Sequence, residues 1–264
     1  MSWNGLKKSF NRAGTTLMQK TGQVDRTVDN EFDSEVAKYR VLEKELNSLH
    51  KDAKSYLDAM RAMTSSEARL AETIELFYSA AELTSDGAMA GHAYKRAVDE
   101  LDTGVGRDLD QPYRHTVLEP IGRFCSYFQM VNAAIEKRNK KLLDYDAART
   151  RMRKLAEKGN DDVTKLPRAQ QENDEAEAVY EVMNSTLLEG LPQMVELRVP
   201  YLDPSFESMV RCQLKFAEEG YEKMSGVQRY FADNVRDEYA SGMLDSQVET
   251  VLAEMKDLSI YGSG

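Results

Sequence analysis

Apolar residues repeat at spacings of three and four along most of the chain, the pattern of helices that bury one face. Residues 24–84 show this pattern most clearly and contain no Pro or Gly, so they predict one helix of about 90 Å. A helix of that length needs coiled-coil-like packing along its side to be stable. Its apolar stripe comprises Val24, Val28, Phe32, Val36, Tyr39, Leu42, Leu46, Leu49, Ala53, Tyr56, Met60, Met63, Leu70, Ile74, Phe77 and Ala81.

Two further long helices are predicted over residues 90–158 and 168–258, the first of them after a turn at residues 85–91. Proline lacks an N–H and clashes with the preceding turn, so prolines inside these helices predict kinks. They are Pro112, Pro120, Pro192, Pro200 and Pro204. No alternating strand pattern is present. The sequence therefore predicts an all-α fold, with three long kinked antiparallel helices in a coiled coil.

Residues 1–20 form a separate basic segment with no acidic residue. On a helical wheel its apolar residues occupy an arc of about 100°, and these are Trp3, Leu6, Phe10, Ala13, Gly14 and Leu17. Gly5 and Gly14 disfavour a helix in water, so we expect residues 2–18 to be disordered until they meet an anionic membrane. The alternative is a terminal arm that docks on the protein's own core.

Charge is distributed unevenly along the 264 residues, whose formal net charge is -10. Residues 137–158 hold nine Lys/Arg and three acids, a local balance of +6. Six of these bases lie within about 140° on a helical wheel: Lys137, Lys140, Lys141, Arg151, Lys154 and Lys158. One-sided charge of opposite sign to the rest of the chain favours a binding surface for an anion-rich partner over an ordinary solvated face.

Other features narrow the possible functions. A pI near 5.0 argues against a nucleic-acid partner, and no run of 18 apolar residues could span a membrane. The histidines His50, His92 and His115 lack the spacing of metal ligands, and Cys125 and Cys212 form no CxxC pair. We place His92 in a turn and expect Asp144 and Asp146 to form intrahelical ion pairs. The sequence predicts no enzyme, no metal and no cofactor.

Four motifs occur in order along the chain: MSWNGLKKSFNRAG, VLEPIGRF, KRNKKLLDYDAAR and LPQMVELRVPYLDPSFESMV. Together they resemble the BAR domain family, specifically the N-BAR group of amphiphysin, endophilin and the fungal Rvs-type proteins. MSWNGLKKSFNRAG at residues 1–14 is similar to the amphipathic N-terminal helix of that group. VLEPIGRF (117–124) resembles its second-helix kink, and KRNKKLLDYDAAR (137–149) its basic segment. LPQMVELRVPYLDPSFESMV (191–210) resembles the kinked third helix of the short members that lack an SH3 domain.

The resemblance implies a crescent-shaped dimer whose concave face binds curved anionic membrane, with residues 1–20 as the inserting helix and residues 21–264 as the BAR domain. It implies a cytoplasmic protein, peripheral to the plasma membrane at cytoskeleton-associated cortical sites. Its expected roles are endocytosis, actin cytoskeleton organisation and cytokinesis. Longer relatives carry an SH3 domain, and we expect none here because the sequence stops at Gly264. The expected protein partner is a second copy in isolation, or a longer SH3-bearing BAR protein.

Transferred position by position, the resemblance assigns the membrane-binding bases. They are Lys137, Arg138, Lys140, Lys141, Arg149, Arg151, Arg153, Lys154, Lys158, Lys165 and Arg168, and the inserting helix contributes Trp3, Leu6, Lys7, Lys8, Phe10, Arg12 and Leu17. The helical wheel places Arg138, Arg149 and Arg153 nearer the apolar side. The alternative function is a coiled-coil cytoskeletal or small-GTPase adaptor that does not remodel membranes, and actin-regulatory proteins or a small GTPase are further candidate partners.

Overall fold

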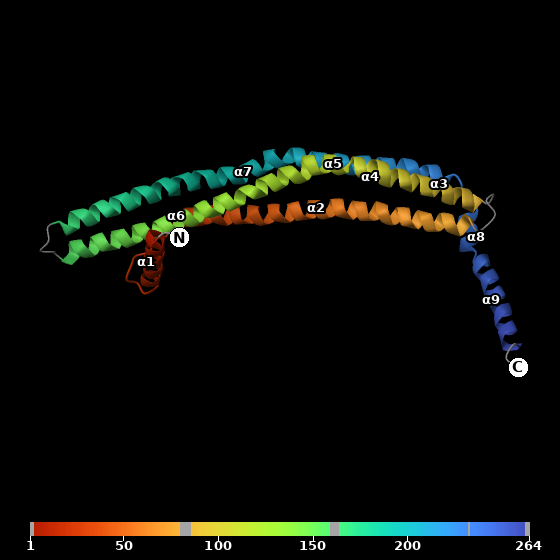
Figure 1. Cartoon of the computed structure of the whole chain (residues 1–264), viewed down its shortest axis with the longest axis horizontal. Helices are drawn as coiled ribbons and strands as arrows, with labels where there is room; N and C mark the ends of the chain where they lie inside the picture. Colours follow the sequence, from red (N-terminus) through yellow and green to blue (C-terminus); the bar gives the residue numbers. More distant parts are fainter. Residues whose placement is uncertain (1–2, 80–85, 159–163, 232, 262–264) are drawn as a thin grey trace. The chain divides into compact units, whose positions relative to one another are not determined.

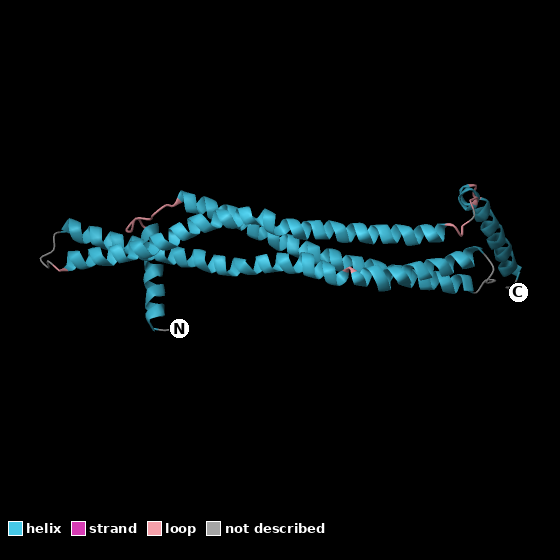
Figure 2. Cartoon of the chain, turned by 90° about the horizontal axis from the view of Figure 1, so that it is seen from above, coloured by secondary structure: helices cyan, strands magenta, loops and turns pink. Residues whose placement is uncertain are grey.

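The computed structural model describes the chain apart from residues 1–2, 80–85, 159–163, 232 and 262–264. The described residues contain helices and no strand (Figure 1, Figure 2), which confirms the all-α fold. Two compact units are formed, residues 1–54 with 115–208 (unit 1) and residues 55–114 with 209–264 (unit 2). The long helices α2 (Asn30–Ser79) and α7 (Lys165–Gln228) contribute to both units.

The first predicted helix is shorter than its apolar pattern suggested. Residues 3–20 form their own helix, α1 (Trp3–Lys20), and α2 begins at Asn30 instead of residue 24. The Asp29 carboxylate accepts a hydrogen bond from the Phe32 N–H at 3.0 Å, which satisfies one free donor of the first turn. The predicted end at residue 84 lies outside the described residues.

The second predicted helix begins earlier and is less regular than expected. The prediction of a turn over residues 85–91 was wrong for its described part, because α3 runs over Asp86–Glu100 and places His92 on a helix. An acid in the first turn, Asp86, suits that helix start.

Irregular turns follow α3, before the long helix α6. Wider π turns occupy Leu101–Val105 and Arg114–Leu118, with the short helices α4 (Gly106–Asp108) and α5 (Asp110–Tyr113) between them. Helix α6 then continues over Glu119–Lys158. Such turns accompany kinks, and they lie where Pro112 and the Gly104–Gly106 pair weaken the regular ladder.

The third predicted helix was right at its start and wrong at its end. Helix α7 has Pro167 in its first turn, where the missing N–H costs nothing, and it continues through Pro192, Pro200 and Pro204. It stops at Gln228, and α8 (Val235–Ala240) and α9 (Met243–Tyr261) follow. Gly242 between them has φ +70°, a conformation that favours glycine and breaks the helix.

Aromatic side chains from α2, α6 and α7 form the core of unit 1. The ring of Tyr39 packs edge-on against Phe128 with centroids 5.8 Å apart, and its hydroxyl donates to Asn132 Oδ1 at 3.0 Å. Burial raises the pKa of Tyr39 to about 12. Phe124 packs against Tyr201 at 5.1 Å, which joins α6 to α7. These contacts fix the three helices side by side within the unit.

Unit 2 combines an apolar core with buried polar links. Leu57, Val98 and Tyr113 are almost fully buried, and the Tyr113 ring lies 5.8 Å from that of Tyr56. Thr64 donates to Asp102 at 2.6 Å, so the π turn after α3 is bonded to α2. This partly buried hydrogen bond is made between two side chains of the unit itself. Several other, apolar side chains of the unit are exposed.

A matched pair of leucines on α7 tests the assigned core of unit 1. Leu191 is 2% exposed and Leu197 is 58% exposed. We expect Leu191→Ala to lower the free energy of unfolding by about 2–5 kcal/mol, because it leaves a cavity, and Leu197→Ala to change it by less than about 0.5 kcal/mol. Urea unfolding followed by circular dichroism at one fixed protein concentration measures both. Equal losses would contradict the assignment.

Candidate functional site

The basic segment of α6 presents its first three lysines differently from its later bases. Lys137 and Lys140 are exposed and Lys141 is half-buried. Within the described part of the chain, Lys137 and Lys141 have no ion-pair partner, and Lys140 pairs only with Glu136, at 3.4 Å. Both members of that pair are more than half exposed, so it contributes little free energy. These three ammonium groups are available to an external anion.

Arg138 does not belong to this surface, which corrects its assignment as a membrane-binding base. Its side chain is 2% exposed and lies 3.8 Å above the centroid of the Phe32 ring. The guanidinium pairs with Asp29 and donates to Asn184 Oδ1 from Nε at 2.9 Å and from Nη2 at 2.6 Å. A further bond from Nη2 reaches the Tyr180 hydroxyl at 2.9 Å. Arg138 thus joins α6 to α7 and to the residue that caps α2.

The later bases of the segment contact other parts of unit 1. Arg149 pairs with Asp146 at 2.9 Å, and Arg151 pairs with Glu172 at 2.8 Å. Arg153 pairs with Asp25 and lies 3.6 Å from Glu157, while Lys154 donates to the Gln23 carbonyl at 3.1 Å. These bases are partly or fully exposed, so their contacts can exchange with solvent or another anion.

The three remaining predicted bases lie near the end of α6 and the start of α7. Lys165 and Arg168 are exposed, and Arg168 Nε lies 3.4 Å from Glu172. Lys158 is the last residue of α6, and its side chain lies outside the described residues. Their role in binding stays a prediction.

The amino-terminal segment is helical here, so the expectation that residues 2–18 are disordered was wrong for the described residues. Phe10 is 82% exposed and Leu17 is 65% exposed, and Lys7 and Lys8 are exposed as well. Arg12 instead turns toward α6 and pairs with Asp144. Trp3 and Leu6 belong to α1, but their side chains lie outside the described residues. The helix therefore presents apolar and basic groups together.

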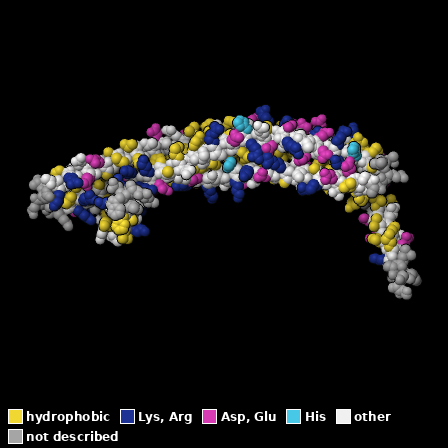
Figure 3. Space-filling view, viewed as in Figure 1, with side chains coloured by type: hydrophobic (Ala, Val, Ile, Leu, Met, Phe, Trp, Pro, Cys, Tyr) yellow, Lys and Arg dark blue, Asp and Glu magenta, His cyan; other side chains and the backbone are white. Residues whose placement is uncertain are grey.

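Two bases, the last residue of α1 and one in the segment after it, were not assigned to the site from the sequence. Lys20 and Arg26 line a cavity of about 480 Å³ next to α1, together with Asp29 and Asp146. Dark-blue basic side chains gather beside α1 in Figure 3. Lys20 is the last residue of the acid-free basic segment, and this position could have identified it as a candidate site residue. Arg26 lies between acidic residues in the sequence, so no charge pattern pointed to it.

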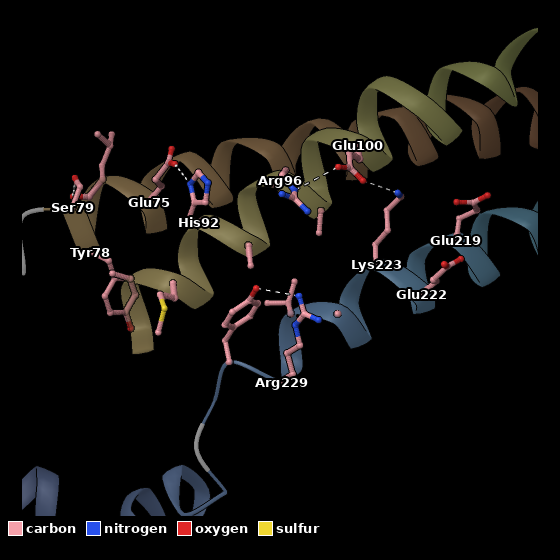
Figure 4. A pocket seen from close by; sticks show the side chains of 18 residues that line it. Glu75, Tyr78, Ser79, His92, Arg96, Glu100, Glu219, Glu222, Lys223 and Arg229 are labelled. Atoms are coloured by element: carbon pink, nitrogen blue, oxygen red, sulfur yellow. Dashed lines mark hydrogen bonds and ion pairs between the residues drawn. The ribbon is translucent and has the colours of Figure 1, made fainter. Parts of the chain in front are cut away.

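Unit 2 holds a larger cavity, of about 960 Å³, between α2, α3 and α7 (Figure 4). Some of its polar side chains contact one another: His92 contacts Glu75 at 3.1 Å, and Lys223 pairs with Glu100 at 2.8 Å. No nucleophile lies beside a base in the contacts found there. Within the described residues, no group of three His, Cys, Asp or Glu is placed to hold a metal ion.

Comparison with known proteins gives consistent matches. The family model described as the BAR domain matches residues 6–233. Protein hob3 of Schizosaccharomyces pombe is 54% identical over 99% of this chain and 98% of its own length. The Regulator of cytoskeleton and endocytosis RVS161 of Candida albicans is 42% identical, with both chains covered completely. The solved amphiphysin BAR domain from Drosophila, 24% identical, has a TM-score of 0.66 over 78% of this chain and 93% of its own.

Neighbouring bases on α6 test the structural role of Arg138. We expect Arg138→Ala to lower the free energy of unfolding by about 3–5 kcal/mol, because it leaves Asp29 and Asn184 without their buried partner. The exposed neighbour Lys137 supplies the control: Lys137→Ala should change the free energy of unfolding by less than about 0.5 kcal/mol. Urea unfolding measures both variants. A small loss of stability in Arg138→Ala would contradict this structural role and support the assignment of Arg138 as a membrane-binding base.

Proposed function

We propose, since this chain belongs to the BAR domain family, that it is a membrane-curvature scaffold that binds anionic membrane through the bases of α6 and inserts the apolar arc of α1. The observation that carries this proposal is a set of three weakly paired lysines in a chain of net charge -10, of which Lys137 and Lys140 are exposed and Lys141 is half-buried. Members of this family are structural scaffolds, so the chain is not an enzyme.

Electrostatic attraction supplies the first part of the binding energy. A base near an anionic leaflet contributes about 1 kcal/mol, and this contribution falls off within a Debye length of about 8 Å at physiological salt. Lys137 and Lys141 can meet lipid phosphates without breaking a described ion pair, and Lys140 gives up only an exposed pair with Glu136. Arg151 and Lys154 would exchange exposed protein contacts for phosphate at small cost.

Insertion of α1 supplies the second part of the binding energy. It also distinguishes a membrane scaffold from the adaptor alternative. Burying apolar surface is worth about 25 cal/mol per Å², so an exposed phenylalanine is an unfavourable surface residue unless something covers it. Phe10 and Leu17 are exposed on the same helix as Lys7 and Lys8. An interfacial membrane helix has this composition, whereas a coiled-coil cytoskeletal or small-GTPase adaptor has no need for it.

The relatives indicate the setting. The Candida albicans relative is named a regulator of cytoskeleton and endocytosis, and we extend that role to this chain together with cytokinesis. We place the protein in the cytoplasm, peripheral to the plasma membrane at cytoskeleton-associated cortical sites. No described helix is long and apolar enough to cross a membrane.

BAR domains dimerise, and unit 2 carries apolar side chains that a partner would cover. Met63, Leu70 and Phe77 are exposed at intervals of seven residues along α2, the spacing of a coiled-coil seam. Leu214 and Tyr221 repeat the interval on α7. We propose that this surface forms a homodimer in isolation and a heterodimer with a longer SH3-bearing BAR protein in the cell.

Charge reversal on α6 tests the lipid site. We expect the triple variant Lys137→Glu, Lys140→Glu, Lys141→Glu to bind anionic vesicles at least about a hundredfold more weakly, because three favourable contacts become repulsive. Co-sedimentation with phosphatidylserine vesicles at low and physiological salt measures this affinity.

A matched variant distinguishes a site from a general charge effect. Lys44→Glu, Lys51→Glu, Lys54→Glu makes the same change in net charge at exposed positions of α2. It should retain most of the affinity. If both variants lose affinity equally, or if neither does, the lysines of α6 are not the lipid site.

The proposed interface generates a prediction about assembly. We expect Leu70→Glu to shift the protein from dimer to monomer at micromolar concentration, because it buries a charge in an apolar seam. Val182→Glu replaces an apolar residue of unit 1 that is more exposed than Leu70, and it should leave the dimer intact. Sedimentation velocity measures both. A dimer that is unaffected by Leu70→Glu would place the interface elsewhere.

A further inference from the structure

Helix α1 is attached to α6 along one side only. The two helices pack together within unit 1, and α1 crosses α6 at a steep angle in both views (Figure 1, Figure 2). Arg12, Thr15 and Gln19 lie at spacings of three and four and face α6 or the residues next to it. Phe10 and Leu17 lie about 140–180° around the helix from Arg12 and Gln19. The polar side of α1 is therefore attached, and its apolar arc points outward.

Arg12 and Asp144 form the main attachment. The guanidinium donates from Nε to Oδ1 at 2.8 Å and from Nη2 to Oδ2 at 2.7 Å, a bidentate pair across 132 residues of sequence. Both side chains are partly shielded, at 21% and 33% exposed. The hydrogen bonding that Arg12 donates to Asp144 is the main reason that the pKa of Arg12 lies above its ordinary value. Bidentate charged pairs are among the stronger and more directional hydrogen bonds in proteins.

Asp146 forms the second attachment, at the other end of α1. Its carboxylate is buried and accepts a hydrogen bond from Gln19 Nε2 at 2.9 Å. It also accepts from the Thr27 N–H at 3.2 Å, from Thr27 Oγ1 at 2.6 Å and from Arg149 Nη2 at 2.9 Å. One carboxylate thus binds the last turn of α1, the segment that follows it and α6. The expectation of intrahelical ion pairs holds for Asp146 and Arg149 but not for Asp144.

We infer that Asp144 and Asp146 are positioning residues that hold α1 folded on α6 before any membrane is present, with Phe10 and Leu17 directed away from the protein. A segment that folds only on binding loses part of its interaction energy to the cost of ordering. A helix that is already ordered loses less, so insertion begins from a prepared state. This inference rests on the proposed membrane function for its purpose, but its structural content can be tested without lipid.

Amide hydrogen exchange of residues 11–20, measured on the full chain in vesicle-free buffer, tests the attachment. We expect protection in the natural sequence and exchange at least about tenfold faster in Asp144→Asn, which corresponds to about 1.4 kcal/mol of local opening. Exchange over residues 120–135 of α6 should not change, which separates local release from general unfolding.

Exchanging the charges of Arg12 and Asp144 tests whether Asp144 acts through its ion pair with Arg12 or only through its packing. Asp144→Arg alone should release α1, and the double variant Arg12→Asp with Asp144→Arg should restore protection, since the pair is remade with opposite polarity. Lys8→Asp is the matched control for Arg12→Asp, because it makes the same change of −2 in charge at an exposed position of α1 and should retain protection. Unprotected amides in the natural sequence, or no rescue by the double variant, would overturn the inference.

Trp3 is the only tryptophan of the chain and reports insertion separately. With phosphatidylserine vesicles, its emission should shift to shorter wavelength in the natural sequence and in the rescued double variant at similar lipid concentrations. Asp144→Asn should need several-fold more lipid, because its helix must be ordered again on binding. An equal lipid requirement for Asp144→Asn would contradict the positioning role. An absent shift in every variant, with protection intact, would refute the proposed membrane function and leave the attachment standing.

Discussion

A single buried guanidinium joins the parts of unit 1 that the candidate site depends on. Arg138 of α6 contacts Asp29 before α2 and both Tyr180 and Asn184 of α7. A charge this deeply buried is tolerated only because its donors find partners and an aromatic ring covers it. Since Lys137 and Lys140 flank it on the same helix, fixing Arg138 inward directs them outward.

Helix periodicity predicted most of this fold because long two-faced helices leave a repeating record in the sequence. It failed where the same spacing continues across a break. Leu244, Val248, Val251 and Met255 continue a helical stripe, but α7 stops at Gln228, and Gly242 with its positive φ separates α8 from α9. The early start of α3 was missed because Gly87 and Gly91 resemble a turn, although both are helical here.

The candidate site was predicted by charge, which gives the face of a helix but not the partners of its side chains. The wheel had already placed Arg138 nearer the apolar side, and its burial follows from that position. Arg153 pairs with Asp25, which lies 128 residues away in the sequence. A local sequence pattern cannot predict such a long-range contact. Lys137, Lys140 and Lys141 have no such partner within the described residues, so their exposure agrees with the local pattern.

The same long-range pairing reverses the expectation for α1. Gly14 costs about 1 kcal/mol relative to alanine within a helix, so a short basic helix is marginal when considered alone. A bidentate pair to Asp144 and a bond to Asp146 offset that cost from outside the helix. The two acids follow the exposed lysines on α6 within one to three turns. One stretch of α6 thus provides both the cationic surface and the anionic anchors of the apolar helix, and this places the two features that we propose to meet the membrane beside each other.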